Sequence, residues 1–120
     1  VDPCVALPHA TSMQDDPLDR LQATIQARRS APADASYTAQ LFARGRPRIA
    51  QKLGEEAIET VIAAIGGDPA AIVPEAADLL YHLLVLLTDA GLALDDIRAE
   101  LTRREGLGGL EEKAARQRAG

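Results

Sequence analysis

The sequence predicts an all-α protein made of a single domain. The chain has 120 residues, of which 47% are hydrophobic and only 2% aromatic, so alanine and aliphatic side chains must fill the core. That composition favours helices over strands. Apolar residues recur at helical spacing between proline and glycine boundaries, and no strand-like alternation of useful length interrupts them.

Two short helices are expected in the first part of the chain. Asp16 followed by Pro17 is typical of a helix start, because the acid caps a free N–H and proline is tolerated in the first turn. The apolar spacing carries this helix to about Arg29. After a loop, Ser36 should cap a short helix that stops at Gly45.

A longer helix is expected from Pro47 to the glycines at 66 and 67. Gly54 lies inside this helix, where glycine is less favourable than alanine by about 1 kcal/mol. A glycine at such a position suggests that another group packs or binds close to the helix backbone.

The following helices are bounded by acidic residues, prolines and glycines. Asp68 begins a segment in which Pro74 either kinks the helix or starts a new one. The apolar pattern then runs unbroken until Gly91 stops it. Asp95 should cap a further helix to about Arg104, and a last helix or turn is expected near the C-terminus.

Residues 1–12 are set apart from the domain predicted at 13–120. They show no periodicity, contain two prolines and precede Met13, so they are either an upstream remnant, which is favoured, or a native disordered tail. Cys4 is the single cysteine, which excludes an internal disulfide and fits a reducing cytoplasm. No secretion signal is recognisable, and no apolar run reaches the roughly 18–20 uncharged residues of a membrane span.

The net charge of −5 argues against a broad basic surface for nucleic acid. No nucleic acid and no membrane are therefore expected as partners. A phosphate-rich ligand would need a few local lysines or arginines, or a bound cation.

One acidic motif lies on the helix that follows Pro47. On a helical wheel of about 100° per residue, Glu55, Glu56 and Glu59 share one sector with Lys52. Apolar side chains cover the opposite side, namely Leu53, Ala57, Ile58, Val61, Ile62 and Ile65. Taken alone, such a motif is usually a solvated helix face.

A second acidic motif begins a helix that is apolar in nearly every direction. Glu75 and Asp78 are three residues apart and share one side of its first turns, and His82 continues the same line. The segment from Leu79 to Leu87 should be buried nearly all round. The acids are either a bias that favours the helix dipole or part of a site.

If the two helices pack against each other, their carboxylates repel unless they take up protons or hold a cation. Oxygen ligands without cysteine select a hard ion such as Mg²⁺ or Mn²⁺. Magnesium also prefers a few carboxylates together with water and substrate phosphates. The two motifs together therefore indicate a phosphate-handling centre.

The two acidic motifs, Glu-Glu-x-x-Glu and Glu-x-x-Asp, resemble the signature of the MazG-like all-α nucleoside triphosphate pyrophosphohydrolases. Between about Leu18 and Gln117 the chain further resembles the phosphoribosyl-ATP pyrophosphohydrolase family, in the segments SYTAQLFARG, KLGEEAIETVIAA, EAADLLYHLLVLL and GLEEKAARQ. Lys-x-Gly-Glu-Glu combined with Asp-Leu-Leu-Tyr-His is far more specific than the acidic pattern. The resemblance implies a MazG-like helical bundle completed by homodimerisation.

The resemblance also implies Mg²⁺-dependent hydrolysis of phosphoribosyl-ATP to phosphoribosyl-AMP and pyrophosphate, the second step of histidine biosynthesis. Carried over by position, the metal ligands would be Glu56, Glu59, Glu75 and Asp78, with Mn²⁺ as a possible substitute for the ion. Glu55 would serve a second metal, orient the attacking water or accept its proton. The expected catalytic residues are therefore Glu55, Glu56 and Glu59.

Other polar and aromatic residues have two interpretations each. Lys52 and Arg48 are expected to bind a substrate phosphate, although Lys52 can equally form an ion pair with the glutamate one turn later. His82 is expected to be a hydrogen-bonded core or interface residue rather than a metal ligand. Tyr37 and Phe42 are expected to pack rather than to stack on a base.

A small chain cannot cover a helix that is apolar on all sides, so a homodimer through the Leu79–Leu92 helix is predicted. Two other functions stay open. One is a house-cleaning pyrophosphohydrolase that uses the same carboxylates on ordinary or damaged nucleoside triphosphates. The other is a non-catalytic helical dimerisation module whose acidic face is simply solvated.

Overall fold

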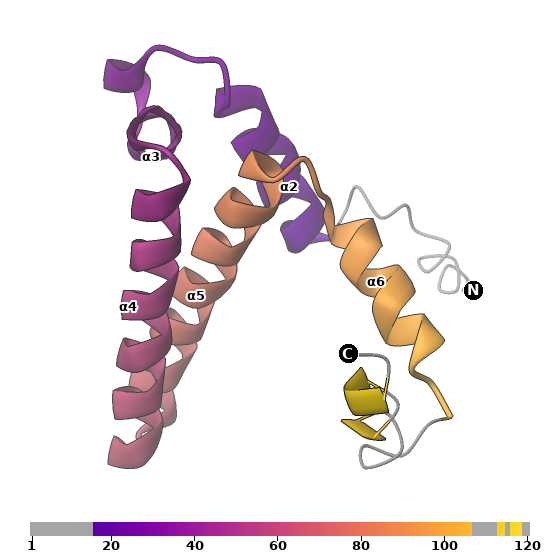
Figure 1. The fold of residues 1–120 in the computed structure, drawn as a ribbon. Helices are drawn as coiled ribbons and strands as arrows, with labels where there is room; N and C mark the ends of the chain where they lie inside the picture. The colour runs from indigo at the N-terminus through magenta and orange to yellow at the C-terminus, as the bar shows by residue number, and fades with distance from the viewer. Residues whose placement is uncertain (1–15, 107–112, 115, 119–120) are drawn as a thin grey trace, which may run out of the picture.

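A computed structural model describes residues 16–106, 113–114 and 116–118, and this part of the chain is helical without any strand (Figure 1). The predicted all-α class is confirmed. The elements are α2 (Pro17–Arg28), the 3-10 turn η3 (Ala33–Ala35), α3 (Tyr37–Arg44), α4 (Arg46–Gly66), α5 (Pro69–Asp89) and α6 (Leu94–Arg103). The segment 1–12 lies outside the described residues, as do residues 110–112 and 115 of the last predicted helix or turn, whose residues 113–114 and 116–117 are helical.

Three of the predicted helix starts are confirmed by side-chain caps. The carboxylate of Asp16 accepts the N–H of Leu18 at 3.0 Å, and the Asp68 carboxylate accepts the N–H of Ala70 at 3.0 Å. At α3, the Ser36 hydroxyl accepts the N–H two residues after the first helical position, at 3.1 Å. These side chains satisfy N–H groups that have no partner inside a helix. Gly45 ends α3 with a φ of 91°, a value that favours glycine.

One helix start differs from the prediction, and one of the two alternatives left open at Pro74 is excluded. The cap of α6 is Ala93, two residues before the expected Asp95, and the carboxylate of Asp96 accepts the Ala93 N–H at 2.9 Å. The acid therefore acts from inside the first turn rather than as the cap itself. Pro74 does not start a new helix, because α5 continues through it from residue 69 to residue 89.

Two long antiparallel helices form the frame of the molecule. Figure 1 shows α4 and α5 side by side along most of their length, with α2 and α3 packed around the end where α4 begins and α5 ends. The core lies at that end and consists of Ile25, Leu41, Ile49, Leu84, Val85 and Leu87. The opposite half of the α4–α5 pair is covered by no other described element.

The structure shows which of the two faces of α4 meets a neighbour. The apolar side is largely exposed, with exposed fractions of 60% for Ile58, 65% for Ile62 and 84% for Ile65. The buried residues of α4 are Ile49 and Glu56. The acidic side therefore faces α5, and the apolar side faces outward.

The expected all-round burial of the second apolar helix is only partly observed. His82 and several later residues of α5 are buried, but Leu80 is 44% exposed and Val73, nearer the start of the helix, is 68% exposed. The close approach expected at Gly54 is also not made within the described chain, because a Cβ at this position would meet no atom within 4 Å. Exposed apolar side chains therefore remain on both long helices.

By length and mean hydropathy, α5 meets the criteria for a membrane-crossing helix. One such helix is weak evidence of a span. It also contains Glu75, Asp78 and His82, and ionisable side chains at membrane depth are energetically costly.

Candidate active site

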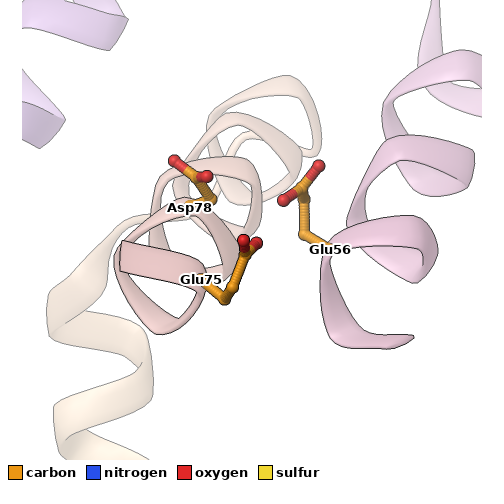
Figure 2. Close-up of side chains that lie close together, drawn as sticks. All are labelled: Glu56, Glu75 and Asp78. Carbon is orange, nitrogen blue, oxygen red and sulfur yellow. The ribbon is translucent and has the colours of Figure 1, made fainter. Parts of the chain in front are cut away.

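Three carboxylates from the two long helices converge in the exposed half of the α4–α5 pair. Glu56 points from α4 toward Glu75 and Asp78 on α5 (Figure 2). One oxygen from each of the three side chains lies within 4.8 Å of the other two. This spacing allows one cation to contact all three residues.

The local sequence explains why the acids meet. Glu75 and Asp78 follow Pro74 on one side of α5, since residues three apart lie on the same helix face. Thr60 fixes the opposite helix, because its hydroxyl oxygen lies 2.8 Å from the Glu56 carbonyl and 3.2 Å from the Glu75 carbonyl. This one hydroxyl group therefore contacts the backbone carbonyls of two site residues that lie on different helices.

Sequence reasoning missed Thr60. The available signal was its position, one helical turn after Glu56 on the same side of α4. A hydroxyl that bonds to a carbonyl four residues earlier is common in helices, so the motif alone does not distinguish this residue.

The cluster is short of positive charge. Glu56 is only 7% exposed, and Oε1 of the half-buried Glu75 is enclosed without a hydrogen-bond partner. Removal from water raises the pKa of Glu75, and the nearby carboxylates of Glu59, Asp78 and Glu56 raise it further. An all-oxygen donor set with an unsatisfied buried oxygen fits a hard divalent cation.

The Lys52 ammonium lies at the edge of this cluster. Its Nζ is 3.2 Å from Oε1 of Glu55 and 3.9 Å from Oε2 of Glu56. The hydrogen bond to Glu55 is the main cause that raises the pKa of Lys52. The alternative interpretation of Lys52 as an intrahelical ion pair is thus observed, with Glu55 as the closer partner.

The remaining predicted site residues surround the cluster without joining it. The Glu55 carboxylate accepts a hydrogen bond from Gln51 at 3.0 Å, and this bond together with Lys52 lowers its pKa. Arg48 is half-buried and contributes to lowering the same pKa, so its charge acts on Glu55. Glu59 is exposed and lies beside Glu75, whose pKa it helps to raise.

A polar and aromatic group lies one helical turn from Asp78. His82 is 5% exposed, with Nδ1 2.8 Å from the Asp78 carbonyl and Nε2 3.1 Å from the Tyr37 hydroxyl. The carbonyl accepts the Nδ1 proton, so Nε2 accepts from the phenol. Thr38 also bonds to the Tyr81 hydroxyl. The expectation that His82 is a hydrogen-bonded core residue is confirmed.

Comparison with known proteins places the chain in one family. A family model described as phosphoribosyl-ATP pyrophosphohydrolase matches residues 18–105. The chain belongs to the phosphoribosyl-ATP pyrophosphohydrolase family. The helices that carry both acidic motifs lie inside the matched range.

Relatives of the phosphoribosyl-ATP pyrophosphohydrolase family match at high identity. The phosphoribosyl-ATP pyrophosphatase of Rhizorhabdus wittichii is 63% identical over 99 residues, which cover 82% of this chain and 93% of that protein. Proteins of the same name from Erythrobacter litoralis and Azospirillum brasilense are 60% and 58% identical, over 82% and 83% of this chain and 95% and 90% of their own lengths. The chain thus matches nearly the whole of each relative.

Proposed function

We propose that this chain hydrolyses phosphoribosyl-ATP to phosphoribosyl-AMP and pyrophosphate, a step of histidine biosynthesis. The high identity to phosphoribosyl-ATP pyrophosphatases over nearly their whole length supports the substrate. The carboxylate cluster of Glu56, Glu75 and Asp78 supports the reaction type. Its negative charge suits a cation that also binds the phosphates of the substrate.

Mg²⁺ is the proposed cofactor, with Mn²⁺ as a possible substitute. Glu56, Glu75 and Asp78 would hold the ion, and Glu59 beside Glu75 would be a further ligand. When bound, the cation would neutralise charge on the departing pyrophosphate and make a water molecule more nucleophilic. Carboxylates together with substrate phosphates are the coordination that magnesium favours in proteins.

The other site residues are assigned to substrate binding and proton transfer. Glu55 is the proposed proton acceptor, because it shares the Lys52 ammonium with Glu56 at the edge of the cluster and is not one of the three clustered acids. Lys52 would exchange part of its contact with Glu55 for a substrate phosphate, and Arg48 would add positive charge on the same side.

The direct test is pyrophosphate release with Mg²⁺ from phosphoribosyl-ATP, ATP, dCTP and dUTP. A strong preference for phosphoribosyl-ATP is expected. Comparable turnover of an ordinary triphosphate would instead support the house-cleaning activity. Loss of turnover on Glu55→Gln substitution is expected if Glu55 accepts the proton, and full turnover of that variant at saturating Mg²⁺ would remove the residue from this role.

A homodimer is the proposed assembly. Ile58, Val61 and Ile65 form one exposed apolar stripe on α4, and Gly54 extends it by one turn with open space at its Cβ. We therefore place the interface on this stripe and on the exposed Leu80 of α5, rather than along the whole Leu79–Leu92 helix. Sedimentation should show a dimer, and a single 12.7 kDa species at micromolar concentration would contradict this assembly.

The domain at 13–120, the cytoplasm as compartment, and the lack of nucleic-acid and membrane partners stay predictions from the sequence. A purely structural role as a dimerisation module is the remaining alternative. It predicts neither turnover nor a metal-dependent rise in melting temperature.

A further inference from the structure

We infer that Tyr37 contacts the nucleoside part of the substrate, with its exposed ring face stacking on the base. This inference rests on the proposed function and adds a residue to which sequence reasoning assigned only packing. It draws on the scarcity of aromatic residues, on the hydrogen bonds that hold Tyr37, and on its position relative to the carboxylate cluster.

The chain offers very few aromatic side chains for a base. It has two tyrosines, one phenylalanine and no tryptophan. Tyr81 and Phe42 are half-buried and pack against the core, whereas Tyr37 is 47% exposed. Tyr37 is therefore the single exposed aromatic residue of the chain.

The exposed ring is held in place from one side. Its hydroxyl donates to Nε2 of the buried His82 at 3.1 Å, and its ring stacks against Tyr81 with centroids 6.2 Å apart and an interplanar angle of 25°. A ring that is fixed by a hydrogen bond and by one stacking partner loses little conformational entropy when a second planar group covers its other face. The pair of tyrosines thus forms the start of a stack that a base extends.

The position of Tyr37 fits a nucleotide whose phosphates lie at the carboxylates. His82 follows Asp78 by one turn on α5, and Lys52 precedes Glu56 by one turn on the antiparallel α4, so both lie on the α3 side of the cluster. Tyr37 is also close enough to Lys52 to be among the groups that raise its pKa, after Glu55. On the other side of the cluster, toward the end of α4, lie the acidic Glu59 and the exposed Ile62 and Ile65.

The two sides of the cluster therefore differ in what they can bind. Toward α3 there are a cation and a fixed aromatic ring, which suit a phosphate followed by a purine. Toward the α4–α5 turn there are a further carboxylate and aliphatic side chains, which offer no contact of that kind. This asymmetry orients the nucleotide with its base toward α3.

The test measures binding of the two products by calorimetry, in the presence of Mg²⁺. Phosphoribosyl-AMP carries the base, whereas pyrophosphate does not. For Tyr37→Leu we expect about a 10-fold weaker Kd for phosphoribosyl-AMP, from the loss of one stacking contact, and an unchanged Kd for pyrophosphate. Tyr37→Phe keeps the ring but loses the hydroxyl that bonds to His82, so it should bind phosphoribosyl-AMP more tightly than Tyr37→Leu and pyrophosphate like the wild type.

Phe42→Leu is the matched control, because it also replaces an aromatic residue of α3 by leucine. It should lower the melting temperature without changing the Kd of phosphoribosyl-AMP. An unchanged Kd for phosphoribosyl-AMP in Tyr37→Leu, an equal loss for pyrophosphate, or no binding of phosphoribosyl-AMP to the wild type would each overturn the inference. Turnover of phosphoribosyl-ATP by the wild type is measured separately, so failure of the proposed function is seen independently of these ratios.

Discussion

The molecule contains two groups of three carboxylates that differ in how their negative charge is balanced. At the α2–α6 contact, Asp16, Asp19 and Asp95 surround Arg98, whose guanidinium nitrogens lie 3.6, 3.0 and 2.9 Å from them. Between α4 and α5, Glu56, Glu75 and Asp78 converge with no arginine among them. The Lys52 ammonium lies at the edge of this group, 3.9 Å from Glu56.

The pKa shifts follow this difference. Hydrogen bonding to Arg98 lowers the pKa of Asp19, and the same contact raises the pKa of Arg98, so both groups stay charged over a wide pH range. The pKa of Glu75 is raised instead, by burial and by the neighbouring acids. The first cluster is complete within the chain. The second has a single lysine at its edge against three acids, and this shortage of positive charge is what marks it as a candidate site.

The largest expected effect is on turnover, and it distinguishes the two carboxylate clusters. Glu56→Gln keeps the size of the side chain but removes a proposed metal ligand, so turnover of phosphoribosyl-ATP should fall by about 100-fold or more. Asp19→Asn is the matched amide replacement in the arginine cluster and should leave turnover close to that of the wild type, because Asp19 and Arg98 lie on α2 and α6 and are not part of the carboxylate cluster. Equal losses in both variants would mean that the carboxylate cluster has no special role.

The next effect concerns metal and stability. Mg²⁺ or Mn²⁺ that binds only the folded state stabilises it by about 2.7 kcal/mol at 100 times Kd. The melting temperature of the wild type and of Asp19→Asn should therefore rise with added metal, and that of Glu56→Gln should rise much less. Thermal melts over a range of metal concentrations measure this. A metal-independent melting temperature in the wild type would favour the structural-module alternative.

The sequence was most informative where local rules decide the structure. The caps at Asp16, Ser36 and Asp68 and the stop at Gly45 follow from side chains that bond to their own helix end. The acidic motifs also pointed to residues that the fold brings together. Helical spacing alone placed Glu75 and Asp78 on one face.

Tertiary packing was less accessible from the sequence. The sequence separates an acidic and an apolar side of α4, but it does not show that Glu56 is buried while Ile65 stays exposed. A helical wheel gives the two faces but not which of them meets a neighbour, and a face covered by a second copy looks the same as a core face. The bonds of Thr60 and Tyr37 across helices also depend on packing that no local motif contains.

Removing one charge without metal should have opposite effects in the two clusters. Glu75→Gln relieves repulsion among the acids and gives the enclosed position a neutral group, so the melting temperature should rise by a few degrees in EDTA. Asp19→Asn removes a carboxylate that accepts two hydrogen bonds from Arg98. This variant should lower the melting temperature by a similar or smaller amount. Thermal melts of both variants beside the wild type decide this, and a decrease for Glu75→Gln would show that the acids are not in conflict.

The smallest effect is the acid response of the arginine cluster. The folded-state pKa of Asp19 lies below its usual value of 3.8, so its contribution to stability is present above that value and is lost as the pH falls through the lower, folded-state pKa. Asp19→Asn should therefore melt below the wild type at pH 7, and the difference should shrink between about pH 4 and pH 2 as the carboxyl takes up a proton. Other acids, including Glu100 with a pKa lowered to about 2 by Arg103 and Arg104, titrate in both proteins and cancel in the comparison. A difference that stays constant down to pH 2 would show that Asp19 acts through its shape and neutral hydrogen bonds, and that the contrast between the two clusters is not one of charge.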